Sequence, residues 1–206
     1  RVLEIDPEHN DTILALDRLY QQEGRWPELG AILQLRVELA EPEDQVDLLM
    51  RLGNLNESAL ENIDEAISAY REVLSIRSEH EEAIDALRRI FAAGHEQVQI
   101  GEILEPIYVA NESHSRLHDL LESLLVHIET VGERSQSIHR LARLSLEELG
   151  DSERALKWYG QAFTEDPTDE DARVEIKRLA RDTNSHSDEV AIYSAALENT
   201  SDSEIM

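Results

Sequence analysis

The sequence has no cysteine and few aromatic residues. The absence of cysteine excludes a disulfide framework and a thiolate metal site. No apolar run approaches the ~18 residues that a membrane helix needs, so we expect no membrane insertion. Aromatic residues make up 4% of the chain, so a core must come from leucine, isoleucine, alanine and valine. Cysteine-free proteins occur on both sides of a membrane, so the lack of cysteine does not decide the compartment. We slightly favour a cytoplasmic location.

Basic residues are scarce, with 19 against 45 acidic residues and a formal net charge of -26. Nucleic acids and anionic membranes attract concentrated lysine and arginine, so this balance argues against both as partners. Two interpretations of the acidic excess stay open. It favours a basic partner, or it only keeps the protein soluble.

Motifs that carry catalysis are also missing. The sequence has no Gly-rich phosphate loop, no GxSxG, no HExxH and no EF-hand loop, so we predict no enzyme activity and no cofactor. His114, His118 and Glu122 are spaced by four residues, so one helix face could offer two imidazoles and a carboxylate to zinc. Because no further ligand or supporting group can be assigned, we interpret this trio as a solvated polar face and predict no metal.

What the sequence does contain is internal repetition. Residues 51–78 align with 140–167, and three shorter blocks, 9–20, 80–91 and 169–180, align with one another. Apolar residues recur in these blocks at steps of three and four, which places them on one face of a helix. Repetition at this scale predicts a solenoid, in which each helix pair packs only on its neighbours.

The first residues of the short blocks also correspond. His9 and His80 occupy equivalent positions at helix starts, where the third block has Asp169. An aspartate at the same place favours a capping or surface role for the two histidines over a role as metal ligands.

Glycine and proline punctuate the helical pattern at the expected helix ends. The predicted helices cover 9–23, 26–40, 43–61, 63–77, 80–93, 97–111, 114–131, 133–149, 151–165, 169–182 and 187–198. Short connections make successive helices antiparallel. We therefore predict an all-α fold, a right-handed α–α superhelix of about five antiparallel helix pairs. It spans residues 1–198 as a single array, followed by a frayed acidic tail, 199–206.

One region breaks the repeat. His9 and His80 are 71 residues apart, but His80 and Asp169 are 89 apart, and the extra length is about one helix with its turn. The break lies near 94–133 and is either a harmless insertion or a bend that shapes a binding surface. Pro106 lies in this region and is expected to kink or restart its helix.

The two longer segments resemble the tetratricopeptide repeat. Gly53 matches the small residue of the family's first helix, and Ala66 and Tyr70 then fall at the small and aromatic positions of the second. The other copy repeats this set with Ala142, Ala155, Tyr159 and Pro167. Small residues let two helices approach closely, and the tyrosines fill the space between neighbouring hairpins. The likeness covers nearly the whole chain and is similar to the long, divergent arrays of large bacterial scaffold proteins.

The resemblance implies a protein–protein interaction scaffold or adaptor that binds a protein or peptide partner in its concave groove. In this family, the residue after the small residue of the first helix faces that groove, and some members clamp a partner's carboxylates there with asparagine and basic residues. Arginine suits bidentate recognition of carboxylates. The predicted partner-binding residues are Arg18, Asn54, Arg89, Arg143 and Arg178.

Other interpretations of the arginines and of the array stay open. Each arginine could pair only with a neighbour on its own helix, as Arg89 could with Asp85 or Arg143 with Glu147. The chain could also be a structural spacer or a self-assembly segment, in which array ends stack into a homo-oligomer. A third possibility is a regulatory arm of a larger multidomain protein.

Overall fold

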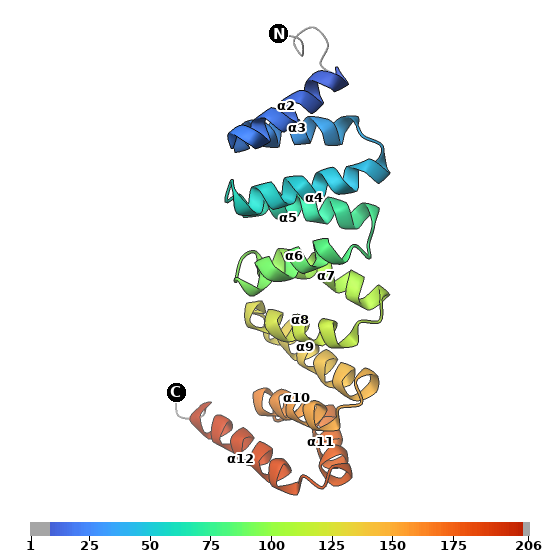
Figure 1. Ribbon diagram of the computed structural model, residues 1–206. Coiled ribbons are helices and arrows are strands. Elements are labelled where there is room, and N and C mark those ends of the chain that lie inside the picture. The colour runs from blue at the N-terminus through green and yellow to red at the C-terminus, as the bar shows by residue number, and fades with distance from the viewer. Residues whose placement is uncertain (1–8, 204–206) are drawn as a thin grey trace. The chain divides into compact units, whose positions relative to one another are not determined.

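The computed structural model describes residues 9–203, and their regular structure is helical throughout (Figure 1). The helices are α2 (Asn10–Glu23), α3 (Trp26–Leu39), α4 (Pro42–Ser58), α5 (Ile63–Ile76), α6 (Glu81–Ala92), α7 (Gln97–Ala110), α8 (His114–Leu124), η1 (Leu125–His127), α9 (Val131–Arg143), η2 (Leu144–Glu148), α10 (Ser152–Glu165), α11 (Glu170–Asp182) and α12 (His186–Ser203). Residues 9–203 contain no strand, so the predicted all-α fold is confirmed. Within this range, no helix has both the length and the apolar character that a membrane crossing requires.

The helix boundaries differ from the prediction mainly near the break in the repeat. The helix predicted for 114–131 ends at Leu124 and continues only as the short turn η1, and the next helix starts at Val131. The Thr130 hydroxyl donates to Glu133 Oε2 at 2.6 Å, which ties the first turn of α9 to the residue before it. At the C-terminal end, we predicted a frayed tail for 199–206, but α12 continues to Ser203. Residues 204–206 lie outside the described residues.

The three aligned short blocks begin their helices in the same way. His9, His80 and Asp169 are N-caps whose side chains accept a backbone N–H from the residue three positions later, at 3.3, 3.3 and 2.9 Å. Each cap satisfies one of the N–H groups that a helix start leaves without a partner. The capping role predicted for the two histidines is therefore confirmed.

The chain divides between Ile107 and Tyr108 into two compact units, which we call the N-terminal and the C-terminal unit. In the N-terminal unit, helices α2 to α6 each pack on the next, and in the C-terminal unit α10 contacts α9, α11 and α12. The division lies inside α7, in the region predicted to break the repeat. Pro106 also lies inside α7, which continues to Ala110 and does not restart.

Small residues bring the helices of each pair together. Ala66, Ala142 and Ala155 are fully buried. At Gly53 a Cβ atom would lie only 2.5 Å from Cε1 of Tyr70, whose side chain is also fully buried. The first helix of this repeat therefore needs glycine at the point where the tyrosine ring crosses it.

The turn between the two helices is the same in both long copies. Its last residue, Asn62 or Asp151, donates its backbone N–H to the carbonyl six residues earlier, at 2.9 and 2.8 Å. The residue before it is left-handed, with φ of 52° at Glu61 and 64° at Gly150. Because the turns coincide, each side chain here can be compared with the one 89 residues further along the chain.

Candidate functional site

The five predicted binding residues lie in three separate settings. Asn54 and Arg89 meet around Tyr70 in the N-terminal unit. Arg143 and Arg178 line one pocket in the C-terminal unit. Arg18 is exposed on α2, lines neither site, and has no hydrogen bond or ion pair with the described residues.

The first setting, the Tyr70 cluster, consists of Asn54 and Glu57 on α4, Tyr70 on α5 and Arg89 on α6. The Tyr70 hydroxyl lies 2.8 Å from Glu57 Oε2 and 3.0 Å from Asn54 Oδ1. Its one proton goes to the carboxylate, which is the stronger acceptor. Arg89 donates to the same carboxylate through Nε and Nη2 at 3.0–3.2 Å. A carboxylate from within the chain thus joins the tyrosine to the arginine.

The electrostatics of the Tyr70 cluster agree with this pairing. Burial raises the pKa of the Tyr70 hydroxyl, and the Glu57 carboxylate raises it further, so the phenol stays protonated and can donate. The hydrogen bond to Glu57 likewise raises the pKa of Arg89. Both donors of the cluster are therefore already engaged within the chain.

The second setting, the Tyr159 pocket, is an open cavity of about 570 Å³ in the C-terminal unit. Its lining comes from α9, η2, α10 and α11 and includes Gln136, His139, Arg143, Leu146, Tyr159 and Arg178. Tyr159 corresponds to Tyr70, and Arg178 to Arg89. The pocket is therefore the counterpart of the Tyr70 cluster in the second copy of the repeat.

Of the four positions that form the Tyr70 cluster, two carry a different residue in the Tyr159 pocket. Arg143 replaces Asn54, and Leu146 replaces Glu57. The Tyr159 hydroxyl makes no hydrogen bond, and Arg143 no ion pair, with any residue that the structure describes. The sequence analysis missed Glu57 and Leu146, although the alignment that pairs the two tyrosines also pairs these residues.

The remaining charges of the pocket are partly paired. Arg178 binds Glu175 on its own helix at 2.5 Å, as the neighbour-pairing alternative predicted for these arginines. Burial is the main cause that raises the pKa of Tyr159, and nearby Glu175 adds to it while Arg143 opposes it. The His139 ring packs edge-on against Tyr159 at 5.8 Å, so the phenol is held on one side. Glu147 and Asp171 also line the pocket.

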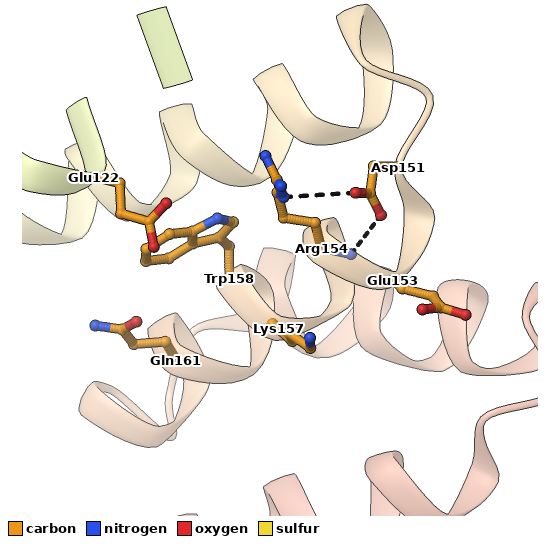
Figure 2. Close-up of a pocket in the computed structure, with 7 residues that line it drawn as sticks. All are labelled: Glu122, Asp151, Glu153, Arg154, Lys157, Trp158 and Gln161. Atoms are coloured by element: carbon orange, nitrogen blue, oxygen red, sulfur yellow. Dashed lines mark hydrogen bonds and ion pairs between the residues drawn. The ribbon is translucent and has the colours of Figure 1, made fainter. Parts of the chain in front are cut away.

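A second pocket of the C-terminal unit, about 420 Å³, lies beside Trp158 (Figure 2). Glu122 and Lys157 line it, and Arg154 is paired there with Asp151 at 3.5 Å. Three carboxylates line it with two cations, and one of these cations, Arg154, is already paired within the chain.

His118 lies against Trp158 and corrects one prediction. Its side chain is fully buried, and its Nε2 accepts the Trp158 Nε1–H at 3.0 Å. The solvated polar face predicted for His114, His118 and Glu122 is therefore wrong at its central residue. The tryptophan that supplies the hydrogen bond is 40 residues away, which local spacing could not reveal.

Among the described residues, His118, Asp119 and Glu122 have potential ligand atoms close enough together to hold a metal ion. Nδ1 of His118 and carboxylate oxygens of Asp119 and Glu122 lie within 4.8 Å of one another. An indole can only donate, so Nε2 of His118 carries the lone pair and the ring proton is on Nδ1. Nδ1 is the atom that faces Glu122 at 3.6 Å, and a metal ligand must be deprotonated. The arrangement does not fit a metal centre.

Comparisons with known proteins identify the repeat. Residues 46–80 match a family model described as tetratricopeptide repeat, and this range holds Gly53, Ala66 and Tyr70. The resemblance to a tetratricopeptide repeat is thereby confirmed for this range, which covers most of α4 and all of α5.

Two crystal structures of MamA match over most of their length. They are 12% and 13% identical to this chain, cover 93% and 91% of it and 98% and 90% of themselves, and have TM-scores of 0.34 and 0.33. No curated protein matches the sequence.

Proposed function

We propose that this chain, a tetratricopeptide-like array, is a protein-interaction scaffold that binds a segment of a protein partner in the Tyr159 pocket. Tetratricopeptide repeats generally bind proteins and are typically not catalytic. The partner segment would present a carboxylate to Arg143 and apolar side chains to Leu146 and Val174, which line the same pocket. Such a groove works through shape and a few polar anchors.

The state of Arg143 carries this proposal. The chain holds 45 acidic residues, and in the equivalent repeat a carboxylate reaches both the tyrosine and the arginine. In the Tyr159 pocket, neither Arg143 nor the Tyr159 hydroxyl is bonded to a described residue. A carboxylate from a partner would satisfy both donors with charge-assisted hydrogen bonds.

The five predicted residues do not contribute equally to this proposal. Arg143 is its anchor, and Arg178 lines the same pocket and pairs only with Glu175 and Asp182 of its own helix. Asn54 and Arg89 are engaged in the Tyr70 cluster. Replacing all the arginines together would therefore break the Arg89–Glu57 pair as well, and only single substitutions give a clear test.

The test is a titration of the ¹⁵N-labelled protein with the peptide acetyl-Ala-Leu-Glu-Leu-Ala-amide, followed by NMR. Backbone amides of α9, η2 and α11 should shift with this peptide, and much less with its glutamine analogue. Arg143 is exposed, and an exposed ion pair contributes up to about 1 kcal/mol, so Arg143→Gln should weaken binding about two- to fivefold.

Lys177→Gln is the matched control, because it removes one exposed cation from α11 without changing the lining of the pocket. Equal weakening by both variants would mean that only overall charge matters and would overturn the proposal. So would a wild-type protein whose pocket amides do not shift. Sedimentation of the same samples reports the alternative function, self-assembly, as a mass that rises with concentration.

A further inference from the structure

We infer that Glu57 is an internal ligand that closes the N-terminal unit to partners, and that the residue at this repeat position decides which unit binds. Glu57 fills the place in the Tyr70 cluster that a partner's carboxylate fills in the Tyr159 pocket. Leu146, at the same position of the other copy, leaves that place open. The inference rests on the proposed function for the identity of the partner group, but part of its test needs no partner.

The surroundings of the two positions correspond, although position 57 lies in the α-helix α4 and position 146 in the π-helix η2, where Leu146 lines the pocket with Tyr159 and Arg178. Both follow the small residue of the first helix by four residues, and both precede a turn with the same backbone hydrogen bond and the same left-handed residue. Tyr70 and Tyr159 are both nearly inaccessible to solvent on the second helix. Arg89 and Arg178 both stand nine residues after the cap of the following helix. A side chain at position 57 or 146 therefore faces the same kind of tyrosine and arginine.

Glu57 makes the contacts expected of a bound ligand carboxylate. One oxygen accepts the Tyr70 hydroxyl proton, and both oxygens accept from the guanidinium of Arg89. The Glu57 side chain is only 21% exposed. It is thus one carboxylate of a strongly acidic chain that is largely withdrawn from solvent and paired with an arginine. Arg89 and Glu57 are 32 residues apart in the sequence and lie on different helices, so their ion pair is not the neighbour pairing of a single helix.

Position 146 has the opposite character. Leucine offers no acceptor, so the Tyr159 hydroxyl and Arg143 have no carboxylate beside them from this position. Arg143 also adds a cation where the N-terminal unit has the neutral Asn54. The Tyr159 pocket therefore has a second arginine and no carboxylate at position 146, although Glu147, Asp171 and Glu175 also line it. An arginine beside an empty acceptor position suits an external carboxylate.

The first experiment closes the Tyr159 pocket from within and needs no ligand. In Leu146→Glu the introduced carboxylate should bond to Arg178 and Tyr159, as Glu57 bonds to Arg89 and Tyr70. A double-mutant cycle with Arg178→Gln should show favourable coupling in urea unfolding. Absence of coupling, with the fold intact by circular dichroism, would overturn the inference whatever the wild-type protein binds.

The second experiment opens the Tyr70 cluster. In the wild-type protein, the acetyl-Ala-Leu-Glu-Leu-Ala-amide peptide should shift amides around Tyr159 only. In Glu57→Leu it should also shift amides of α4 and α6, and the stoichiometry should rise from one to two. Glu57→Gln retains the shape of the side chain and should keep the cluster closed. Glu72→Leu, which removes an exposed glutamate from α5, should also leave one site.

The outcomes separate the two proposals. Peptide shifts at the Tyr159 pocket in the wild-type protein, without a second site in folded Glu57→Leu, would overturn the role of Glu57 and leave the proposed function standing. No shifts at the pocket, together with clear coupling in the Leu146→Glu cycle, would support the role of Glu57 and overturn the proposed function. Leu146→Glu should in addition weaken peptide binding at least about tenfold.

Discussion

Substituting Gly53 with alanine should destabilise the protein, although alanine is the better helix former. A Cβ at this position would lie 2.5 Å from Tyr70 Cε1 and 2.9 Å from Cδ1 and Cζ. The ring cannot simply swing away, because it is fully buried and its hydroxyl is bonded to Glu57. Overpacking costs about 1–3 kcal/mol, and the helix preference of alanine returns up to about 1 kcal/mol. We expect a net loss of about 1–2 kcal/mol.

Gly30→Ala in α3 is the matched control for this substitution. Its Cβ would lie 3.6 Å from Leu60 Cδ1 and 3.8 Å from Leu55 Cδ2, which are ordinary contacts. This variant should be more stable than the wild type by about 0.5–1 kcal/mol, because only the helix preference changes. Urea unfolding followed by circular dichroism gives both values. A Gly53→Ala protein as stable as Gly30→Ala would refute the reasoning about the tyrosine.

Three further predictions concern buried polar groups. Asp17, buried between Arg36 and Arg51, has a pKa lowered mainly by its hydrogen bond to Arg51. Asp17→Asn should lower the free energy of unfolding by about 2–3 kcal/mol in urea titrations. This is less than for a fully buried pair, because Arg51 is 39% exposed. The control, Glu72→Gln, should have almost no effect. The stabilisation from Asp17 is present above its unfolded pKa of 3.8 and should be lost in acid titrations as pH falls through the lower folded pKa. Burial lowers the pKa of His118 below 6.5, with Arg154 adding to the effect. The unfolded chain therefore binds the proton first, and stability should fall as the solution is acidified below about pH 6.5; the same loss in His118→Gln would contradict this. Zinc should not raise the melting temperature, because the Trp158 hydrogen bond leaves the proton on His118 Nδ1; a zinc-dependent rise that Glu122→Gln abolishes would show otherwise.

Much of the fold followed from the sequence because its signals are local. Gly24, with φ of 67°, ends α2 where the glycine was expected to end it. The caps at His80 and Asp169 start α6 and α11 through a backbone N–H only three residues away. In a solenoid each helix packs mainly on its sequence neighbours, so correct local boundaries place most contacts. The division between Ile107 and Tyr108 lies directly after Pro106, within the predicted break, but the repeat spacing gave this break only as a range of about 40 residues.

The site was less accessible to sequence reasoning because its pairings are not local. The recurrence of Arg89 and Arg178 located corresponding positions, but it did not show that Arg89 pairs with Glu57 on another helix. The i,i+4 spacing of Arg143 and Glu147 allowed an ion pair between them. Both residues are described in the structure, and they form no such pair. Periodicity gives the face on which a side chain lies, whereas pairing depends on which helix lies opposite.

The two arginine pairs also differ in how readily a partner could displace them. Both arginines are exposed, Arg178 to 47% and Arg89 to 60%, but Arg178 pairs only with Glu175 and Asp182 of its own helix. Pairs of this kind on one helix contribute about 0–1 kcal/mol, so an incoming carboxylate could replace them at little cost. Glu57 is held by both Tyr70 and Arg89, and its removal would leave a buried hydroxyl without a charged acceptor. In our proposal the same tyrosine and arginine therefore form a displaceable site in one unit and a closed one in the other, and the residue at position 57 or 146 makes the difference.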